Sequence, residues 1–362
     1  MEQELKKTPI YESHVTRGGQ IVDFAGWALP VRFKNLREEH AHVRDKVGIF
    51  DVSHMGEIRV TGSEALTTLQ WLTTNDVSRL QKGQAQYTLF PNSQGGIVDD
   101  LIVYCIEPNQ DYLLCVNGAN IEKDYQFMLA NNRGAKIENQ SDQWGQIAVQ
   151  GPLAIQTLNQ VFGQSFSDLP GFQFLPLDYK GELCYVARTG YTGEDGAEIF
   201  VPSHLTRDLW EVFLKTPDVE PIGLGARDTL RTEMKYPLYG QDINDQTFPH
   251  EAGLGWVVKF DKGDFLGATP MRKAFETGLK RKLVGLLLLT PGIARPGCEV
   301  FSIDSKQAGV VTSGTLSPSL NQAIAIAYVS PDLAGIGSKV LVQVRNKMIE
   351  AKVVKTPFYK KG

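Results

Sequence analysis

The stretch Gly95-Gly96-Ile97-Val98-Asp99-Asp100-Leu101-Ile102-Val103-Tyr104 places two adjacent carboxylates inside an otherwise apolar segment. Paired glycines favour a turn, and the β-branched residues after them predict a strand that is covered on at least one face. Side chains alternate along a strand, so Asp100 is expected to share a face with Ile102 and Tyr104, and Asp99 to point the other way. Burying an unpaired carboxylate is costly, so one acid should face a cation, hydrogen-bond donors or a cationic ligand. The alternative is that both acids only complete the turn.

Short strands and helices alternate on both sides of this stretch. A strand at 111–116 meets Asn117-Gly118-Ala119-Asn120, where Asn120 is expected to cap a helix, and a strand at 147–150 turns into a helix near Pro152. This alternation, with polar connections, predicts α+β layers. From about residue 280 the pattern changes to strands with turn-rich spacers, which predicts a small β-barrel or sandwich from the strand-like segments 282–289, 299–302, 308–312, 323–329, 339–344 and 348–354.

Composition excludes several classes of protein. A chain of 362 residues is long enough for two to three domains, and a net charge of -4 gives no basic field for nucleic acid or an anionic membrane. The four cysteines are far apart without a C-x-x-C motif, which argues against a zinc site or a redox dithiol, and no metal is expected. The N-terminus lacks the apolar core of a signal peptide, and no segment is long and apolar enough to span a membrane, so a cytoplasmic protein is expected. Phosphate-loop, dinucleotide and zinc-protease motifs are absent from the sequence.

Two further segments combine glycines with charged residues. Arg188 to Glu198 contains three carboxylates and an aromatic residue; Glu198 lies beyond the turn, between apolar neighbours, and repeats the pattern of Asp100. The alternative for this segment is a solvated hairpin. Gly223 to Arg231 is a glycine-rich entry into a helix, and it places Arg227 near the first turn, where the helix dipole disfavours a cation. Arg227 therefore needs a partner such as Glu198 or a ligand carbonyl or carboxylate, unless it lies on the surface with Asp228 as the capping acid.

The motifs of the chain, taken in order, resemble those of the T proteins of the glycine cleavage system, a family of tetrahydrofolate-dependent aminomethyltransferases. They cover nearly the whole chain, and their joint order makes the resemblance highly specific. The motifs are Val22-Asp23-Phe24-Ala25-Gly26-Trp27, Phe50-Asp51-Val52-Ser53-His54-Met55-Gly56-Glu57, Gly95 to Asp100, Val116 to Asn120, Arg188 to Glu198, Gly223 to Asp228, Leu238-Tyr239-Gly240-Gln241-Asp242 and Pro357-Phe358-Tyr359.

The resemblance implies an α+β fold in which three modules form a disc around a central folate channel. Two interleaved α/β domains of the ferredoxin-like type would be discontinuous in sequence, and a small C-terminal β-barrel would follow. The implied boundaries are 1–50 with 140–245 for a folate-binding domain one, 51–139 with 246–278 for a domain two that carries the Asp100 strand, and 279–362 for the barrel.

The resemblance also implies roles for individual residues. Asp100 would be the essential catalytic carboxylate near the attacking folate nitrogen, where it would polarise that amine or stabilise a cationic carbon. Glu198 would accept hydrogen bonds from the pterin. The resemblance leaves two roles open for His54, a catalytic residue or a structural loop residue. For Tyr359 the alternative is a frayed chain end. The implied folate-binding set is Met55, Tyr87, Asp100, Asn117, Tyr191, Glu198, Arg227, Met234 and Tyr359.

In the reaction that this family implies, the H protein carries an aminomethyl group on its lipoyl arm. Tetrahydrofolate takes the carbon, giving methylene-tetrahydrofolate, ammonia and dihydrolipoyl H protein. Tetrahydrofolate is thus the expected co-substrate, and the lipoylated H protein the expected partner. Three alternatives stay open: a folate-linked demethylating unit, a folate-binding iron–sulfur assembly factor, and a catalytically silent folate store. The first normally carries a flavin domain, and the second a cysteine motif where this chain reads Tyr236-Pro237-Leu238-Tyr239-Gly240-Gln241-Asp242.

Overall fold

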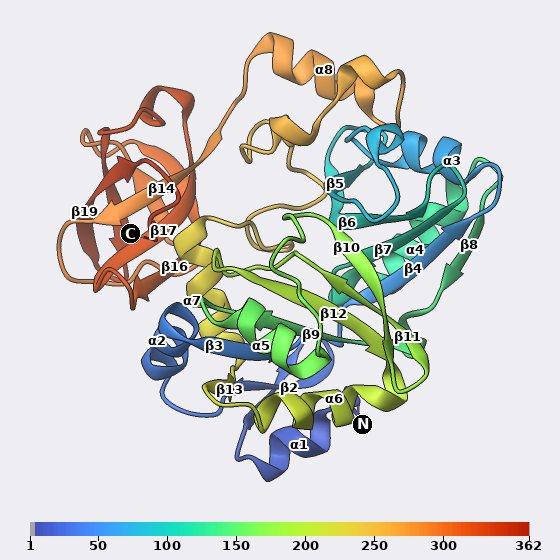
Figure 1. Ribbon diagram of the computed structural model, residues 1–362. Helices are drawn as coiled ribbons and strands as arrows, with labels where there is room; N and C mark the ends of the chain where they lie inside the picture. The colour runs from blue at the N-terminus through green and yellow to red at the C-terminus, as the bar shows by residue number, and fades with distance from the viewer. Residues whose placement is uncertain (1–3, 362) are drawn as a thin grey trace. The chain divides into compact units, whose positions relative to one another are not determined.

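The computed structural model describes residues 4–361, which divide into two compact units (Figure 1). Unit 1 comprises the described residues up to Leu72 together with Asp76–Thr88 and Leu101–Arg227. Unit 2 comprises Thr73–Asn75, Leu89–Asp100 and the described residues from Asp228 onward. Each unit therefore contains segments that are far apart in the sequence.

A six-stranded sheet in unit 1 is covered on both faces. On one face, alternate residues such as Val149, Ile199 and Val201 pack under helices α5 (Ala154–Phe162) and α6 (Ser203–Leu214), which lie on the same side of the sheet in Figure 1. The residues between them face the opposite way, as strand alternation requires. The strands, in spatial order, are β10 (Phe174–Tyr179), β11 (Glu182–Ala187), β12 (Gly196–Pro202), β9 (Trp144–Gln150), β3 (Val47–Asp51) and β13 (Val219–Pro221).

The strand that contains the two aspartates belongs to a second, five-stranded sheet. Its spatial order is β5 (Ala85–Pro91), β6 (Ile97–Glu107), β7 (Asp111–Val116), β4 (Gly56–Thr61) and β8 (Lys136–Asn139). Helix α4 (Ile121–Ala130) covers one face, because a side chain in place of Gly56 would collide with Ile121 of that helix. Among the acids on these strands, Glu57 and Asp99 are buried, whereas Asp100 and Asp111 are partly exposed.

Shorter elements complete unit 1. Helix α2 begins at Leu36, where Asn35 caps it, and its buried Glu39 accepts hydrogen bonds from the backbone N–H groups of Phe33, Lys34 and Gly223. These elements are α1 (Tyr11–Thr16), β1 (Gln20–Phe24), β2 (Trp27–Arg32), α2 (Leu36–Asp45), α3 (Ala65–Leu72) and the 3-10 turns η1 (Val77–Arg79), η2 (Gly118–Asn120) and η3 (Ser141–Gln143).

Unit 2 contains the closed barrel. Helix α7 (Leu224–Met234) begins in unit 1 and ends in unit 2, and after it come η4 (Gly255–Val257), η5 (Phe260–Lys262), α8 (Ala268–Thr277) and, within the barrel, η6 (Pro331–Leu333). Small and β-branched residues such as Ala327, Val329 and Val342 fill the barrel interior. Its strands, in spatial order, are β14 (Lys282–Leu288), β17 (Gln322–Val329), β16 (Gln307–Ser317), β15 (Glu299–Phe301), β18 (Lys339–Val344) and β19 (Lys347–Val354).

The expected mixed α/β fold with a C-terminal barrel is confirmed, and every predicted barrel strand overlaps an observed one. Asn120 is the N-cap residue of α4, as the sequence predicts, although it also ends the 3-10 turn η2 and its side chain accepts no capping hydrogen bond.

Candidate functional site

The two sheets face each other within unit 1 across a mostly apolar layer. Tyr104 and Cys115 from the five-stranded sheet pack with Tyr185 and Phe200 from the six-stranded sheet. The rings of Tyr104 and Phe200 meet edge to face with centroids 5.2 Å apart. Groups that enter this layer lose most of their hydration, so the polar ones must find partners there or in a ligand.

Glu198 enters the layer from β12, as its position between apolar neighbours indicated. It is 7% exposed, and its Oε2 accepts a hydrogen bond of 2.6 Å from the hydroxyl of Thr189, which lies 3.4 Å from the hydroxyl of Tyr104. Nearby, the thiol of Cys115 donates to Oε1 of Gln146 over 3.5 Å. The layer between the sheets thus contains six polar groups among its apolar residues: Glu57, Tyr104, Cys115, Gln146, Thr189 and Glu198.

Arg227 is the cation beside this layer. Its guanidinium lies 4.8 Å from the ring centroid of Tyr191, in a cation–π arrangement. Burial lowers the pKa of Arg227, and the charge of Glu198 is the main influence that opposes this lowering. Its Nη1 is buried and has no hydrogen-bond partner among residues 4–361. Of the two expected partners, Glu198 therefore supplies charge, while that nitrogen remains open to a carbonyl or carboxylate.

Glu57 is a buried acid that the sequence pattern does not indicate as a site residue. It lies on β4 opposite Cys115 of β7 and is 1% exposed. Neither of its carboxyl oxygens has a hydrogen-bond partner within the described chain. The burial raises the pKa of Glu57 well above its ordinary value, which favours the protonated form of this acid.

His54 lies in the loop between β3 and β4 and is 5% exposed. Burial, reinforced by the positive charge of Arg227, lowers the pKa of His54 to about 4, so its imidazole is neutral at pH 7. Its ring meets that of Phe24 edge to face at 5.5 Å, and a side chain at Gly118 would collide with its backbone oxygen. These contacts are those of a tightly packed loop residue.

The other predicted residues of unit 1 lie around the same elements. Met55 packs against the apolar cluster that contains Tyr104 and Cys115. Tyr87 lies on β5 and is partly buried, and Asn117 precedes the turn η2 at the end of β7. The structure therefore gathers Met55, Tyr191, Glu198 and Arg227 around one layer.

In unit 2, the segment before the two aspartates is held by a loop. A side chain at Gly96 would lie 1.8 Å from the backbone oxygen of Asp245, and the N–H of Ile97 donates to the backbone oxygen of Thr247. The fully buried acid is Asp99, whereas Asp100 is partly exposed. Alternation places Asp100 on the strand face of Ile102, as expected.

The last two predicted residues lie together in unit 2. Met234 ends α7, and the N–H groups of Phe358 and Tyr359 donate to the backbone oxygen of the preceding residue, Glu233, at 2.8 and 3.3 Å. The carboxylate of Glu233 accepts hydrogen bonds from Ser317 and Ser319 of the barrel domain. Tyr359 is thus partly buried and docked, not frayed.

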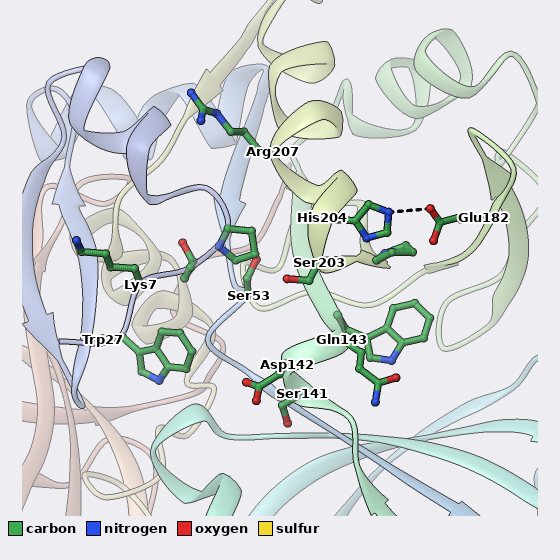
Figure 2. Close-up of a pocket in the computed structure, with 14 residues that line it drawn as sticks. Lys7, Trp27, Ser53, Ser141, Asp142, Gln143, Glu182, Ser203, His204 and Arg207 are labelled. Atoms are coloured by element: carbon green, nitrogen blue, oxygen red, sulfur yellow. Dashed lines mark hydrogen bonds and ion pairs between the residues drawn. The ribbon is translucent and has the colours of Figure 1, made fainter. Parts of the chain in front are cut away.

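A separate open cleft of about 850 Å³ lies elsewhere in unit 1, and none of the predicted site residues lines it (Figure 2). Trp27, Trp144 and Arg207 contribute to its walls, and His204 pairs with Glu182 at 2.7 Å.

Within residues 4–361, no group of three or more His, Cys, Asp or Glu side chains could hold a metal ion. In the same residues, no helix is both long and apolar enough to cross a membrane.

Comparison with known proteins gives consistent matches over the chain. The model of the GCVT N-terminal domain matches residues 10–262, and that of the glycine cleavage T-protein C-terminal barrel domain matches residues 281–360. A protein of Bdellovibrio bacteriovorus named aminomethyltransferase is 51% identical over 99% of this chain and 100% of its own length. One of Caldanaerobacter subterraneus with the same name is 48% identical over 99% of this chain and 97% of its own. The crystal structure of the glycine cleavage system aminomethyltransferase T from Bartonella henselae is 33% identical, with a TM-score of 0.93 over 98% of both chains.

Proposed function

The chain belongs to the family of glycine cleavage T proteins, which are aminomethyltransferases, and on this premise we propose that it transfers a one-carbon unit to tetrahydrofolate. The donor is the aminomethyl group on the lipoyl arm of an H protein. The products are methylene-tetrahydrofolate, ammonia and dihydrolipoyl H protein.

The observation that carries this proposal is the environment of Glu198. A buried carboxylate accepts hydrogen bonds only, and a pterin presents a row of N–H donors on one edge. Tyr191 supplies an aromatic wall, and the open nitrogen of Arg227 suits a ligand carbonyl or carboxylate. Flexible or planar side chains also line the proposed folate pocket, namely those of Met55, Tyr87, Asn117, Met234 and Tyr359.

Asp100 is the proposed catalytic carboxylate. In the transfer, the carbon leaves both the lipoyl sulfur and its own nitrogen and forms bonds to the two folate nitrogens. Each folate nitrogen gives up one proton; one proton completes ammonia and the other completes the lipoyl thiol. A carboxylate near the attacking amine polarises it and stabilises the cationic carbon that develops between the two bonding steps.

Two further expectations, on localisation and on domain division, accompany this proposal. We place the enzyme in the cytoplasm, where a lipoyl carrier and folate would both be available to it. We also retain the interleaved domain division, with 1–50 and 140–245 in one domain, 51–139 and 246–278 in the second, and 279–362 in the barrel domain.

Release of ammonia from an aminomethylated lipoyl carrier, measured with and without tetrahydrofolate, tests the proposal. We expect release to depend strongly on tetrahydrofolate. A folate store would bind tetrahydrofolate without turnover, and a demethylating unit would act on a small methylated amine instead of the carrier. An iron–sulfur assembly factor would leave the carrier unchanged, and any of these three results would overturn the proposal.

A further inference from the structure

Glu57 is a buried acid that the proposed mechanism does not use. It is 1% exposed, yet neither carboxyl oxygen has a hydrogen-bond partner within residues 4–361. Native proteins pair nearly all buried polar groups, since an unsatisfied one loses its hydration without compensation. A group left in this state needs an explanation outside the protein's own contacts.

The orientation of Glu57 follows from its neighbours on β4. Gly56 faces helix α4, because a side chain there would collide with Ile121 and Val116. Strand alternation therefore turns Glu57 away from α4 and toward the six-stranded sheet. Arg59, on the same strand face as Glu57, interacts with Tyr185 of β11, which confirms that this face meets the opposite sheet.

Glu57 and Glu198 act on the same two groups. In its ionised form, each of them raises the pKa of the Cys115 thiol and of the Tyr104 hydroxyl, although burial is the larger cause for both groups. Cys115 is also the residue directly opposite Glu57 in the β4–β7 ladder. The two carboxyl groups therefore enter the same layer from opposite sheets, one from β4 and the other from β12.

We propose that Glu57 is a ligand-recognition residue of this layer, whose carboxyl group hydrogen-bonds to the heterocycle of the bound folate. The inference rests on the proposed function, since it assigns Glu57 to the same ligand as Glu198. The two acids would differ in chemistry. Glu198 accepts hydrogen bonds, whereas a protonated Glu57 both donates and accepts, which suits a heterocycle edge where a carbonyl lies beside an N–H.

Binding measured beside thermal stability tests this assignment. Glu57→Met removes both hydrogen-bonding atoms at similar length, and we expect tetrahydrofolate affinity to fall about tenfold or more, which corresponds to the loss of one good hydrogen bond. Glu57→Gln keeps one donor and one acceptor, so its affinity should stay within about threefold of wild type. Both variants should melt no lower than wild type, because they remove an unpaired buried acid. Glu276→Met, at an exposed position of α8, is the matched control and should change neither quantity.

A fragment of the ligand shows whether Glu57 contacts the heterocycle or the tail of the folate. With 6-methyltetrahydropterin, which lacks the aminobenzoylglutamate tail, Glu57→Met should show the same fold-loss as with tetrahydrofolate. Glu57→Asp, which keeps the acid but shortens its reach, should also weaken binding and serves if Glu57→Met does not fold. Unchanged affinity in Glu57→Met and Glu57→Asp would overturn the inference alone, as would a lower melting temperature in Glu57→Gln. A wild-type protein that binds no folate would instead overturn the proposed function.

Discussion

At the scale of single residues, replacing Asp100 should mainly lower turnover, whereas replacing Glu198 should mainly weaken tetrahydrofolate binding. Asp100 is partly exposed and is proposed to act on the reacting atoms. Asp100→Asn and Asp100→Ala should therefore keep the fold and most of the tetrahydrofolate affinity while lowering turnover at least a hundredfold, which single-turnover kinetics and equilibrium binding would measure. Near-wild-type transfer by both variants would contradict the role of Asp100.

Glu198 is proposed to hold the ring and not the reacting carbon. Removal of a charged hydrogen-bond acceptor typically costs about 1.5–3 kcal/mol, so Glu198→Ala should weaken tetrahydrofolate binding about 10- to 100-fold. The effect should appear mainly in KM, with a smaller change in kcat. Thr189→Val, which removes the hydroxyl that donates to Glu198, provides a comparison with the acid retained. A titration of Glu198→Ala with unchanged affinity would refute this assignment.

His54 predicts a particular dependence of stability on pH. Its pKa is about 4 in the folded protein, against about 6.5 in an unfolded chain, because burial and the Arg227 charge disfavour the imidazolium. The unfolded state therefore binds the proton first, and stability should fall as the pH drops from about 6.5 to about 4, by up to about 3 kcal/mol. Urea unfolding at pH 7 and at pH 5 would show a smaller difference for His54→Gln than for wild type. An NMR titration with a His54 pKa near 6.5 would contradict the account.

At the scale of elements, a buried ion pair between helix α7 and the loop that follows it contacts strand β16 of the barrel. Arg231 is 1% exposed and binds Asp242 at 2.6 Å, and Ser313 of β16 donates to the same carboxylate. Arg231 also binds Asp228, whose side chain is 48% exposed. The two acids thus share one partner in different surroundings.

This contrast provides a matched pair of variants. Asp242→Asn leaves the Arg231 charge buried and should lower the free energy of unfolding by about 3–5 kcal/mol. Asp228→Asn breaks a largely hydrated pair and should cost about 1 kcal/mol or less. Urea denaturation of both variants measures the difference. Equal losses would show that burial does not decide the strength of these contacts.

Elements with local sequence signals could be predicted from the sequence, and elements that depend on long-range contacts could not. The barrel strands were predicted closely because alternating β-branched residues and turn-rich spacers are local signals. Many charges with scattered apolar positions predict a surface helix over 31–46, but the helix begins at Leu36 and buries Glu39, whose three backbone partners include the distant Gly223. Long-range partners of this kind leave no periodic signal.

The candidate site shows the same limit. Apolar neighbours on both sides single out Glu198 in the sequence. In contrast, the charged residues Glu57 and Arg59 alternate with the apolar residues Ile58 and Val60, a pattern typical of a strand with one solvated face. The six-stranded sheet covers that face, so Glu57 is buried. Between the two aspartates, the pattern could not decide which is more buried, and the structure buries Asp99 fully.

At the scale of the whole molecule, the family matches cover both the N-terminal region and the barrel, and the relatives align over nearly their full lengths. The residues proposed for folate come from segments between Met55 and Tyr359, so the activity should require the intact chain.

The most direct measurement follows the carbon itself. An H protein that carries a 13C-labelled aminomethyl group on its lipoyl arm is mixed with the enzyme and tetrahydrofolate, and the products are observed by NMR. We expect the label to appear in methylene-tetrahydrofolate in a one-to-one ratio with released ammonia. Label that stays on the carrier, or that appears as free formaldehyde at the same rate with and without tetrahydrofolate, would contradict it.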